Sequence, residues 1–227
     1  MLVTVLLEGF HAVKHALRFG ADVQSLITTD LAATISLAET HAPDLRERFA
    51  AATEVDEEQF KRRFLIGRIH PTGVAGLADR PNLPFDRGTP LVLLDNPRNL
   101  GNFGAAIRVA AGLDAGGVIS TGDVDPWHPN VLRGSAGLHF ALPVARATSL
   151  DFAGELIAFD AGGELLKGPI PDDAVLAFGS ERHGLSAEVR AKASRIVSLP
   201  MRETISSYNL TTSVAMGLYH WAIHRAS

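Results

Sequence analysis

The stretch LVLLDNPRNLGNFGAAIRVAAG, residues 91–112, decides which fold class is expected for the C-terminal part of this chain. It begins with an apolar run that is typical of a buried strand. It continues through a loop rich in Asn, Pro and Gly and enters a small-residue segment that predicts a helix. A buried strand followed by a loop and a helix is the unit of parallel α/β sheets, and ligands bind at such loops.

The glycines of this loop do not match the two familiar phosphate-binding fingerprints. They stand as GNFG, residues 101–104, where a dinucleotide site has GxGxxG, and no Lys-Ser or Lys-Thr pair follows them. The spacing therefore disfavours both a Rossmann-type oxidoreductase and a triphosphate-binding enzyme.

Arg108 is the distinctive residue of the predicted helix. Its helical neighbours, three and four positions away, are Gly104, Ala105, Ala111 and Gly112. The guanidinium is thus expected above a surface with almost no side chains, which a phosphate or another backbone can approach closely. The alternative is tight helix packing with Arg108 extending to water.

The rest of the C-terminal part alternates between apolar runs and helical patterns. Strands are expected at 91–95, 116–121, 140–145, 174–179 and 195–200, and helices up to 112, near 130–137, near 186–193 and from about 211 onward. Continuous apolar strands that alternate with helices predict a parallel sheet covered on both faces.

The first 80 residues predict a separate, smaller α/β unit. A helix is expected within 8–20, a strand at 23–29, helices capped by Asp30, Asp44 and Asp56, and a strand after the turn at 70–73. The stretch 81–89 is rich in Pro and has no apolar period, which is typical of a linker. The expected domains are therefore 1–80 and 90–227.

Composition excludes several kinds of chemistry. The 227 residues include no cysteine, which rules out disulfides, thiolate metal sites and a thiol nucleophile. The nine histidines form no HExxH or similar pair, so no metal site is expected. No apolar run reaches 18 residues and the start lacks the features of a signal peptide, so we expect a cytoplasmic protein without a membrane span.

Charge argues weakly against bulk attraction to nucleic acid, because the net charge is -4. The densest basic stretch is KRRFLIGRIH, residues 61–70. A solvated helix face is the simpler interpretation of so short a run, and a local RNA contact is the alternative.

Two later segments concentrate polar groups beside apolar elements. LAFGSERHGLS, residues 176–186, places Glu181 at the carboxyl end of a predicted strand, where it is either a ligand-binding carboxylate or an ordinary loop acid. LPMRETISSYNLTTSVAMGLYHW, residues 199–221, crowds Ser, Asn and Thr residues at a helix start, although one capping residue would suffice.

Together these segments resemble the SpoU/TrmH family of SPOUT RNA methyltransferases. The string DNPRNLGNFGAAIR, the GSExxG loop and the LPM…SYNLTTSVA segment are similar to its three signature motifs and occur in the same order. Residues 125–144 match the segment between the first two motifs. More weakly, residues 1–80 resemble the ribosomal-protein-like substrate-binding domain that often precedes them. Tyr208, Thr211 and Arg182 depart from the family's commonest pattern.

The resemblance implies transfer of a methyl group from S-adenosyl-L-methionine to a ribose 2'-hydroxyl of rRNA or tRNA. It also implies a C-terminal trefoil knot and a homodimer built partly on the last helix. The implied cofactor-binding positions are Gly179, Leu199, Met201, Tyr208 and Leu210. The implied catalytic set is Asn99, Arg108, Glu181, Ser207 and Asn209.

Physical reasoning refines one of these roles. An arginine side chain stays charged in proteins, so we expect Arg108 to hold the target phosphate and stabilise developing alkoxide charge. Proton removal by Arg108 is the rival hypothesis. In the first domain the expected RNA contacts are Lys14, Arg62, Arg63 and Arg68. The alternative function is a non-catalytic RNA-binding or ribosome-assembly factor on the same scaffold.

Overall fold

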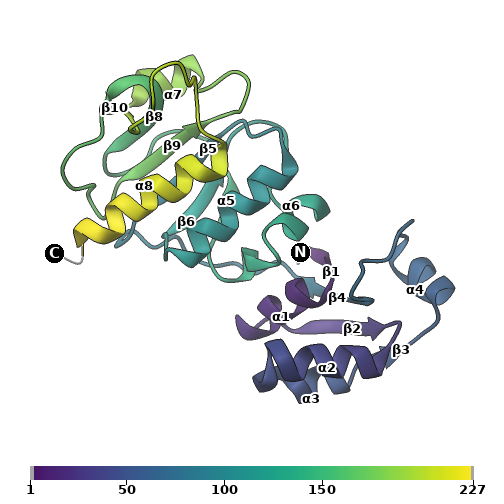
Figure 1. Cartoon of the computed structure of the whole chain (residues 1–227). Coiled ribbons are helices and arrows are strands. Elements are labelled where there is room, and N and C mark those ends of the chain that lie inside the picture. Colours follow the sequence, from purple (N-terminus) through teal and green to yellow (C-terminus); the bar gives the residue numbers. More distant parts are fainter. Residues whose placement is uncertain (1–2, 226–227) are drawn as a thin grey trace. The chain divides into compact units, whose positions relative to one another are not determined.

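A computed structural model of the chain describes residues 3–225 (Figure 1). The described chain forms two compact units that divide between Asn82 and Leu83. Residues Ala136–Ala141 belong with the first unit, although they lie far along the sequence. The return of this short segment to the first unit was not predicted from the sequence.

The first unit is an α/β unit built on a mixed sheet in the order β1-β4-β2-β3. The strands are β1 (Thr4–Glu8), β2 (Val23–Thr28), β3 (Thr53–Glu54) and β4 (Val74–Asp79), with β4 antiparallel to β1 and β2 and with β3 parallel to β2. The helices are α1 (Phe10–Arg18), α2 (Leu31–His41), the 3-10 turn η1 (Pro43–Leu45), α3 (Arg46–Ala50) and α4 (Glu57–Phe64). Phe10 and Phe49 stack in its core with ring centroids 4.5 Å apart.

Two of the three predicted helix caps in this unit are confirmed. The Asp30 and Asp56 carboxylates accept hydrogen bonds from the backbone N–H groups of Ala33 and Gln59, at 2.8 Å each. The cap at Asp44 is wrong, because Asp44 lies inside η1 and its carboxylate accepts hydrogen bonds from Arg18. That hydrogen bond from the Arg18 guanidinium lowers the pKa of Asp44.

The second unit contains the predicted parallel sheet, in the order β10-β8-β9-β5-β6-β7. The strands are β5 (Leu91–Asp95), β6 (Gly117–Ser120), β7 (Val144–Arg146), β8 (Leu156–Leu165), β9 (Val175–Gly179) and β10 (Arg195–Ser198). The helices are α5 (Leu100–Gly112), α6 (Pro129–Gly134), η2 (Leu138–Phe140), α7 (Ala187–Lys192) and α8 (Leu210–Arg225); η2 lies in the segment that belongs to the first unit.

One predicted strand in this region is misplaced, and one strand was not predicted. Of the expected strand at 140–145, only the last two residues form strand, in the short β7. Phe140 ends the 3-10 turn η2, and Pro143, just before β7, cannot donate a ladder hydrogen bond. β8 was not predicted, since Asp160 and the Gly162–Gly163 pair interrupt its apolar pattern, yet it lies between β9 and β10.

Both faces of the parallel sheet are covered, as expected. On one face Leu93 and Ala177 form a cluster with Val189 of α7. On the other face the rings of Phe159 and Phe178 stack, with centroids 4.5 Å apart, beneath Gly217 of α8. A Cβ at that glycine would lie 3.0 Å from the Phe159 ring, so the small residue lets α8 approach closely.

The strand order reverses between β5 and β9, which places a crevice at their carboxyl ends. This edge is where the motif loops emerge. The trefoil knot stays a prediction. Among the residues from 3 to 225, no helix is long and apolar enough to cross a membrane.

Candidate active site

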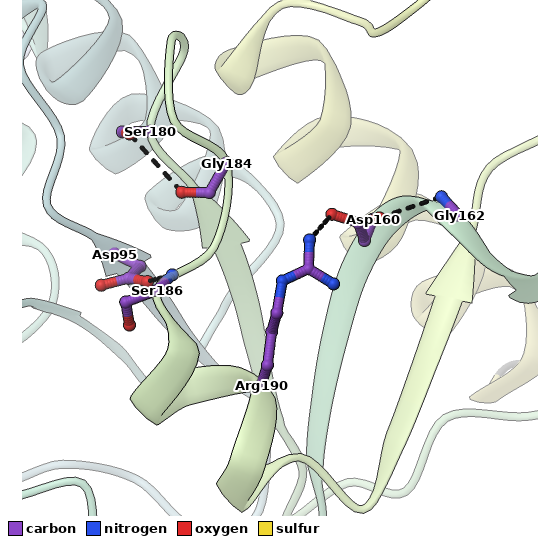
Figure 2. Close-up of polar contacts among 7 residues, drawn as sticks. All are labelled: Asp95, Asp160, Gly162, Ser180, Gly184, Ser186 and Arg190. Carbon is purple, nitrogen blue, oxygen red and sulfur yellow. Dashed lines mark hydrogen bonds and ion pairs between the residues drawn. The ribbon is translucent and has the colours of Figure 1, made fainter.

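A buried carboxylate anchors the crevice. Asp95, at the end of β5, is 3 % exposed and is the register partner of Gly179 at the end of β9. Its carboxylate accepts a hydrogen bond of 2.6 Å from the backbone N–H of Ser186, which Figure 2 shows, and one of 2.7 Å from the Thr121 hydroxyl. Asp95 therefore ties the loops after β6 and β9 to the central strand.

The loop after β9 is a tight turn that carries the GSExxG motif. Ser180 and Gly184 exchange two backbone hydrogen bonds of 3.0 and 2.9 Å, and the three residues between them are exposed. Gly179 has to be glycine, because a Cβ there would lie 2.2 Å from the carbonyl carbon of Gly184 and 2.4 Å from the nitrogen of Leu185. Gly184 has a φ of +64°, a conformation that glycine adopts without strain.

All five predicted cofactor-binding residues line one cavity of about 390 Å³ at this edge. They are Gly179, Leu199, Met201, Tyr208 and Leu210. Glu181 and Ser207 of the predicted catalytic set line the same cavity. We call this space the donor cavity.

The residues around the donor cavity fit S-adenosylmethionine. The volume lies within the range of small-molecule sites, and the stacked rings of Phe159 and Phe178 provide an apolar wall of the kind that receives an adenine. The Glu181 carboxylate and the Ser206 and Ser207 hydroxyls supply polar groups for an amino-acid moiety and a ribose. Sequence reasoning missed the β8 contribution to this wall because it did not predict β8.

An ion pair between Asp160 and Arg190 holds one wall of the donor cavity in place. Asp160, which lines the cavity at the middle of β8, accepts hydrogen bonds from the Arg190 guanidinium of α7 and from the backbone N–H of Gly162 (Figure 2). Because its carboxylate is already engaged, Asp160 serves to position the wall.

A third asparagine, which sequence reasoning did not single out, connects the motif loops. The Asn102 side-chain amide donates to Glu181 at 2.8 Å, and its side-chain oxygen accepts from the Asn209 amide at 3.2 Å. Its backbone carbonyl also accepts from the Thr211 hydroxyl at 3.2 Å. Glu181 and Asn209 of the predicted set are therefore brought together through Asn102. The feature of the sequence that could have indicated Asn102 is its position in the first turn of α5, directly after the first motif loop.

Asn99 has a local structural role. Its side-chain oxygen accepts a 3.0 Å hydrogen bond from the backbone N–H of Asn102, which caps the start of α5. The cap holds Asn102 at the first turn of the helix, facing the loop that carries Glu181.

Arg108 lies outside the donor cavity. Its side chain is exposed and makes no hydrogen bond or ion pair within residues 3–225. One flank of its small-residue surface is occupied, because a Cβ at Gly104 would lie 2.3 Å from the carbonyl oxygen of Val131 in α6. Helix packing thus explains Gly104, while nothing lies within 4 Å of a Cβ at Gly112.

The predicted RNA contacts of the first unit differ in exposure. Lys14 is only 9 % exposed, which makes it the weakest candidate. Arg62 pairs with Glu58 at 2.8 Å on α4, and Arg63 donates to the Ser25 hydroxyl at 2.9 Å. Arg68 is exposed and makes no hydrogen bond or ion pair within the described part of the chain.

Known proteins of similar sequence are RNA methyltransferases. A sequence profile of the SpoU rRNA Methylase family matches residues 89–219. A 23S rRNA (adenosine(1067)-2'-O)-methyltransferase from Streptomyces laurentii is 29 % identical over 96 % of this chain and 86 % of its own. The mitochondrial rRNA methyltransferase 3 of Xenopus laevis is 34 % identical over 65 % of this chain, and the match spans only 36 % of that longer protein.

Solved structures of similar fold cover nearly the whole chain. An AdoMet-bound rRNA methyltransferase from Sinorhizobium meliloti is 26 % identical with a TM-score of 0.75, covering 99 % of this chain and 88 % of its own. The SpoU methyltransferase AviRb from Streptomyces viridochromogenes has a TM-score of 0.77 and covers 98 % of this chain and 91 % of its own. Since it is only 24 % identical, this similarity supports the fold and not the function. The profile spans more than half of the chain and includes each motif loop, and on this ground the chain belongs to the SpoU rRNA methylase family.

Proposed function

We propose that this protein transfers a methyl group from S-adenosylmethionine to a ribose 2'-hydroxyl of rRNA, with tRNA as the alternative acceptor. The observation that carries the proposal is the meeting of the three motif loops at one sheet edge, where Asn102 links Glu181 to Asn209 beside the donor cavity. The family's description and the names of the relatives support rRNA as the acceptor.

In this proposal the donor cavity holds the cofactor, which supplies a methyl group on a sulfonium. Gly179 leaves room for the backbone of the loop, and Leu199, Met201 and Leu210 surround the apolar part of the cofactor. The Tyr208 hydroxyl donates a 2.8 Å hydrogen bond to the Pro200 carbonyl, which joins the two ends of the loop between β10 and α8.

The acceptor side needs a ribose held in line with the methyl group, and a hydroxyl whose proton leaves. Glu181, Ser207 and Asn209 orient the two reactants. Arg108 acts as a charged clamp on the target phosphate and stabilises the developing oxygen charge. Proton removal by Arg108 is the rival.

We further propose a homodimer built on α8. Tyr219 is 60 % exposed and Ile223 is 43 % exposed, which leaves two large apolar side chains, one turn apart on this helix, that a second copy can cover. Arg108 lies outside the donor cavity of its own chain, so a second chain that brings its own Arg108 to the site would complete it. Arg62, Arg63 and Arg68 are proposed RNA contacts of the first unit, and a cytoplasmic location stays a prediction.

Tritium transfer tests the proposed reaction. Protein-free rRNA and tRNA from a cell that lacks this protein are incubated with methyl-labelled S-adenosylmethionine, and the label is mapped. A 2'-O-methyl group protects the following phosphodiester from alkali, so the label is expected in an alkali-resistant dinucleotide. Label in rRNA supports the proposal, label in tRNA alone corrects the acceptor, and RNA binding without transfer supports the non-catalytic factor.

A further inference from the structure

A second cavity of about 390 Å³ lies beside the donor cavity. Its lining residues are Arg98, Asn99, Ser180, Glu181, Arg182 and His183. The segment from Ser180 to Arg182 lines both cavities and forms their common wall. Arg98 and His183 line only the second cavity, so substitutions there can be assigned to it.

The side chains of this second cavity carry an excess of uncommitted positive charge. Two guanidinium groups, on Arg98 and Arg182, line it together with one carboxylate, Glu181, which accepts a hydrogen bond from the uncharged Asn102 amide. Arg98 makes one long contact, 3.4 Å to Asp123, while both of these side chains remain exposed. Arg182 and His183 are exposed and make no hydrogen bond or ion pair within the part of the chain that the structure describes.

We propose that this second cavity binds a phosphodiester group of the RNA next to the target ribose. The inference rests on the proposed function, because methyl transfer requires the acceptor ribose at the wall that borders the donor cavity. A phosphodiester flanks every ribose, so a phosphate falls just beyond that wall. Guanidinium groups match phosphate oxygens with paired hydrogen bonds, and an imidazole N–H adds a further donor.

The same charges disfavour the cofactor's sulfonium in this cavity, because like charges repel. The cofactor's carboxylate is the other anion that three cationic or donor side chains can hold. Separate measurements of RNA binding and of S-adenosylmethionine binding distinguish the two anions, because the phosphodiester belongs to the RNA and the carboxylate belongs to the cofactor.

The test uses the full chain with Arg98→Ala, His183→Ala and the double variant, and Lys167→Ala as control. Lys167 is an exposed cation on the connection between β8 and β9, and it lines neither cavity. Binding of an unmodified 23S rRNA transcript and of unmodified tRNA is measured over a salt series, and calorimetry gives the affinity for S-adenosylmethionine.

We expect the double variant to bind the preferred RNA about 10- to 100-fold more weakly, as the loss of charged hydrogen bonds predicts. The slope of log affinity against log salt should fall by about 0.7 to 0.9 for each lost phosphate contact. Arg98→Lys should keep the wild-type slope, which a merely structural role would not explain. Cofactor affinity and the control should match the wild type.

An unchanged RNA affinity and salt slope in the double variant would overturn the proposal. Loss of cofactor affinity with unchanged RNA binding would also overturn it and assign the cavity to the cofactor's carboxylate. Because binding is measured without methyl transfer, a wild-type protein that binds RNA without methylating it contradicts only the proposed function.

Discussion

Asn102 is the residue on which the arrangement of the motif loops depends. Its side chain donates to Glu181 and accepts from Asn209, two residues that stand 28 positions apart and on separate loops. A hydrogen bond to a carboxylate contributes more than one between neutral groups, because one partner is charged. Asn102 is therefore a positioning residue for both.

Asn102→Ala should lower kcat/KM for rRNA about 10- to 100-fold, the effect of losing one charged and one neutral hydrogen bond. Asn102→Asp should lower it further, since a second carboxylate would face Glu181. Radiolabel transfer at varied RNA concentration measures the effect. Asn130→Ala is the control, because Asn130 is exposed on α6 and its side-chain oxygen accepts a hydrogen bond from Arg133, outside the cluster of motif loops. Equal activity of Asn102→Asp and the wild type would contradict this role.

One substitution distinguishes the two proposed roles of Arg108, which are holding the target phosphate as a charged clamp and removing the hydroxyl proton as a base. Arg108→Lys keeps the positive charge but loses the paired hydrogen bonds to a phosphate. The clamp predicts a loss of about 10-fold or more in kcat/KM with an unchanged pH profile. A rate that rises with a new, lower apparent pKa in the lysine variant would favour Arg108 as the base. Initial rates from pH 6 to pH 10 make the comparison.

Among the helices, α5 shows why a glycine-rich motif has two physical explanations. Gly104 sits against the α6 backbone and is required by packing, while Gly112 at the end of the same helix has open space around it. The packing alternative for the small residues near Arg108 is therefore correct for one flank of the helix and does not apply at the other.

Gly104→Ala should destabilise the protein by about 1 to 3 kcal/mol, because the new methyl group overlaps the Val131 carbonyl. Gly112→Ala should be neutral or stabilise it by up to about 1 kcal/mol, since alanine favours the helix and meets no neighbour. Urea unfolding at pH 7 measures both variants. Equal loss of stability in the two variants would show that packing against α6 is not the cause.

In the full protein, Arg108 does not line the donor cavity of its own chain. The donor cavity and the Asn102 cluster belong to one chain, whereas Arg108 projects from α5 without a partner in the described residues. The exposed Tyr219 on α8 marks the proposed contact with a second copy.

Mixing two inactive variants tests a shared site. If Arg108 acts in the site of the neighbouring copy, a dimer of one Arg108→Ala chain and one Asn209→Ala chain has one intact site. Random mixing should then restore about a quarter of the wild-type activity, because half of the dimers are mixed and half of their sites are intact. No recovery in co-expressed chains would contradict sharing. Tyr219→Asp should lower both the molar mass by light scattering and the activity.

The sequence alone determined the local elements and the family. Periodicity and capping residues located most helices and strands, including α2, α4 and α5, because these features act over a few neighbouring positions. The motif strings also predicted five cofactor-binding residues. These residues line one cavity in the structure, and their role in binding the donor stays a prediction. The Gly-containing strand β8 was not predicted, because it is stabilised by pairing with β9 and β10 on its two sides, and no local sequence pattern reports such pairing.

Which polar groups meet depends on how distant segments pack in the folded protein. Asn102 reaches Glu181 and Asn209 because β5 and β9 are neighbours in the sheet, and strand order depends on packing between segments far apart in the chain. The same adjacency places Arg98 beside His183 and creates the second cavity. Sequence thus determined the chemistry available to this protein, and the order of the parallel strands determined which of those groups act together.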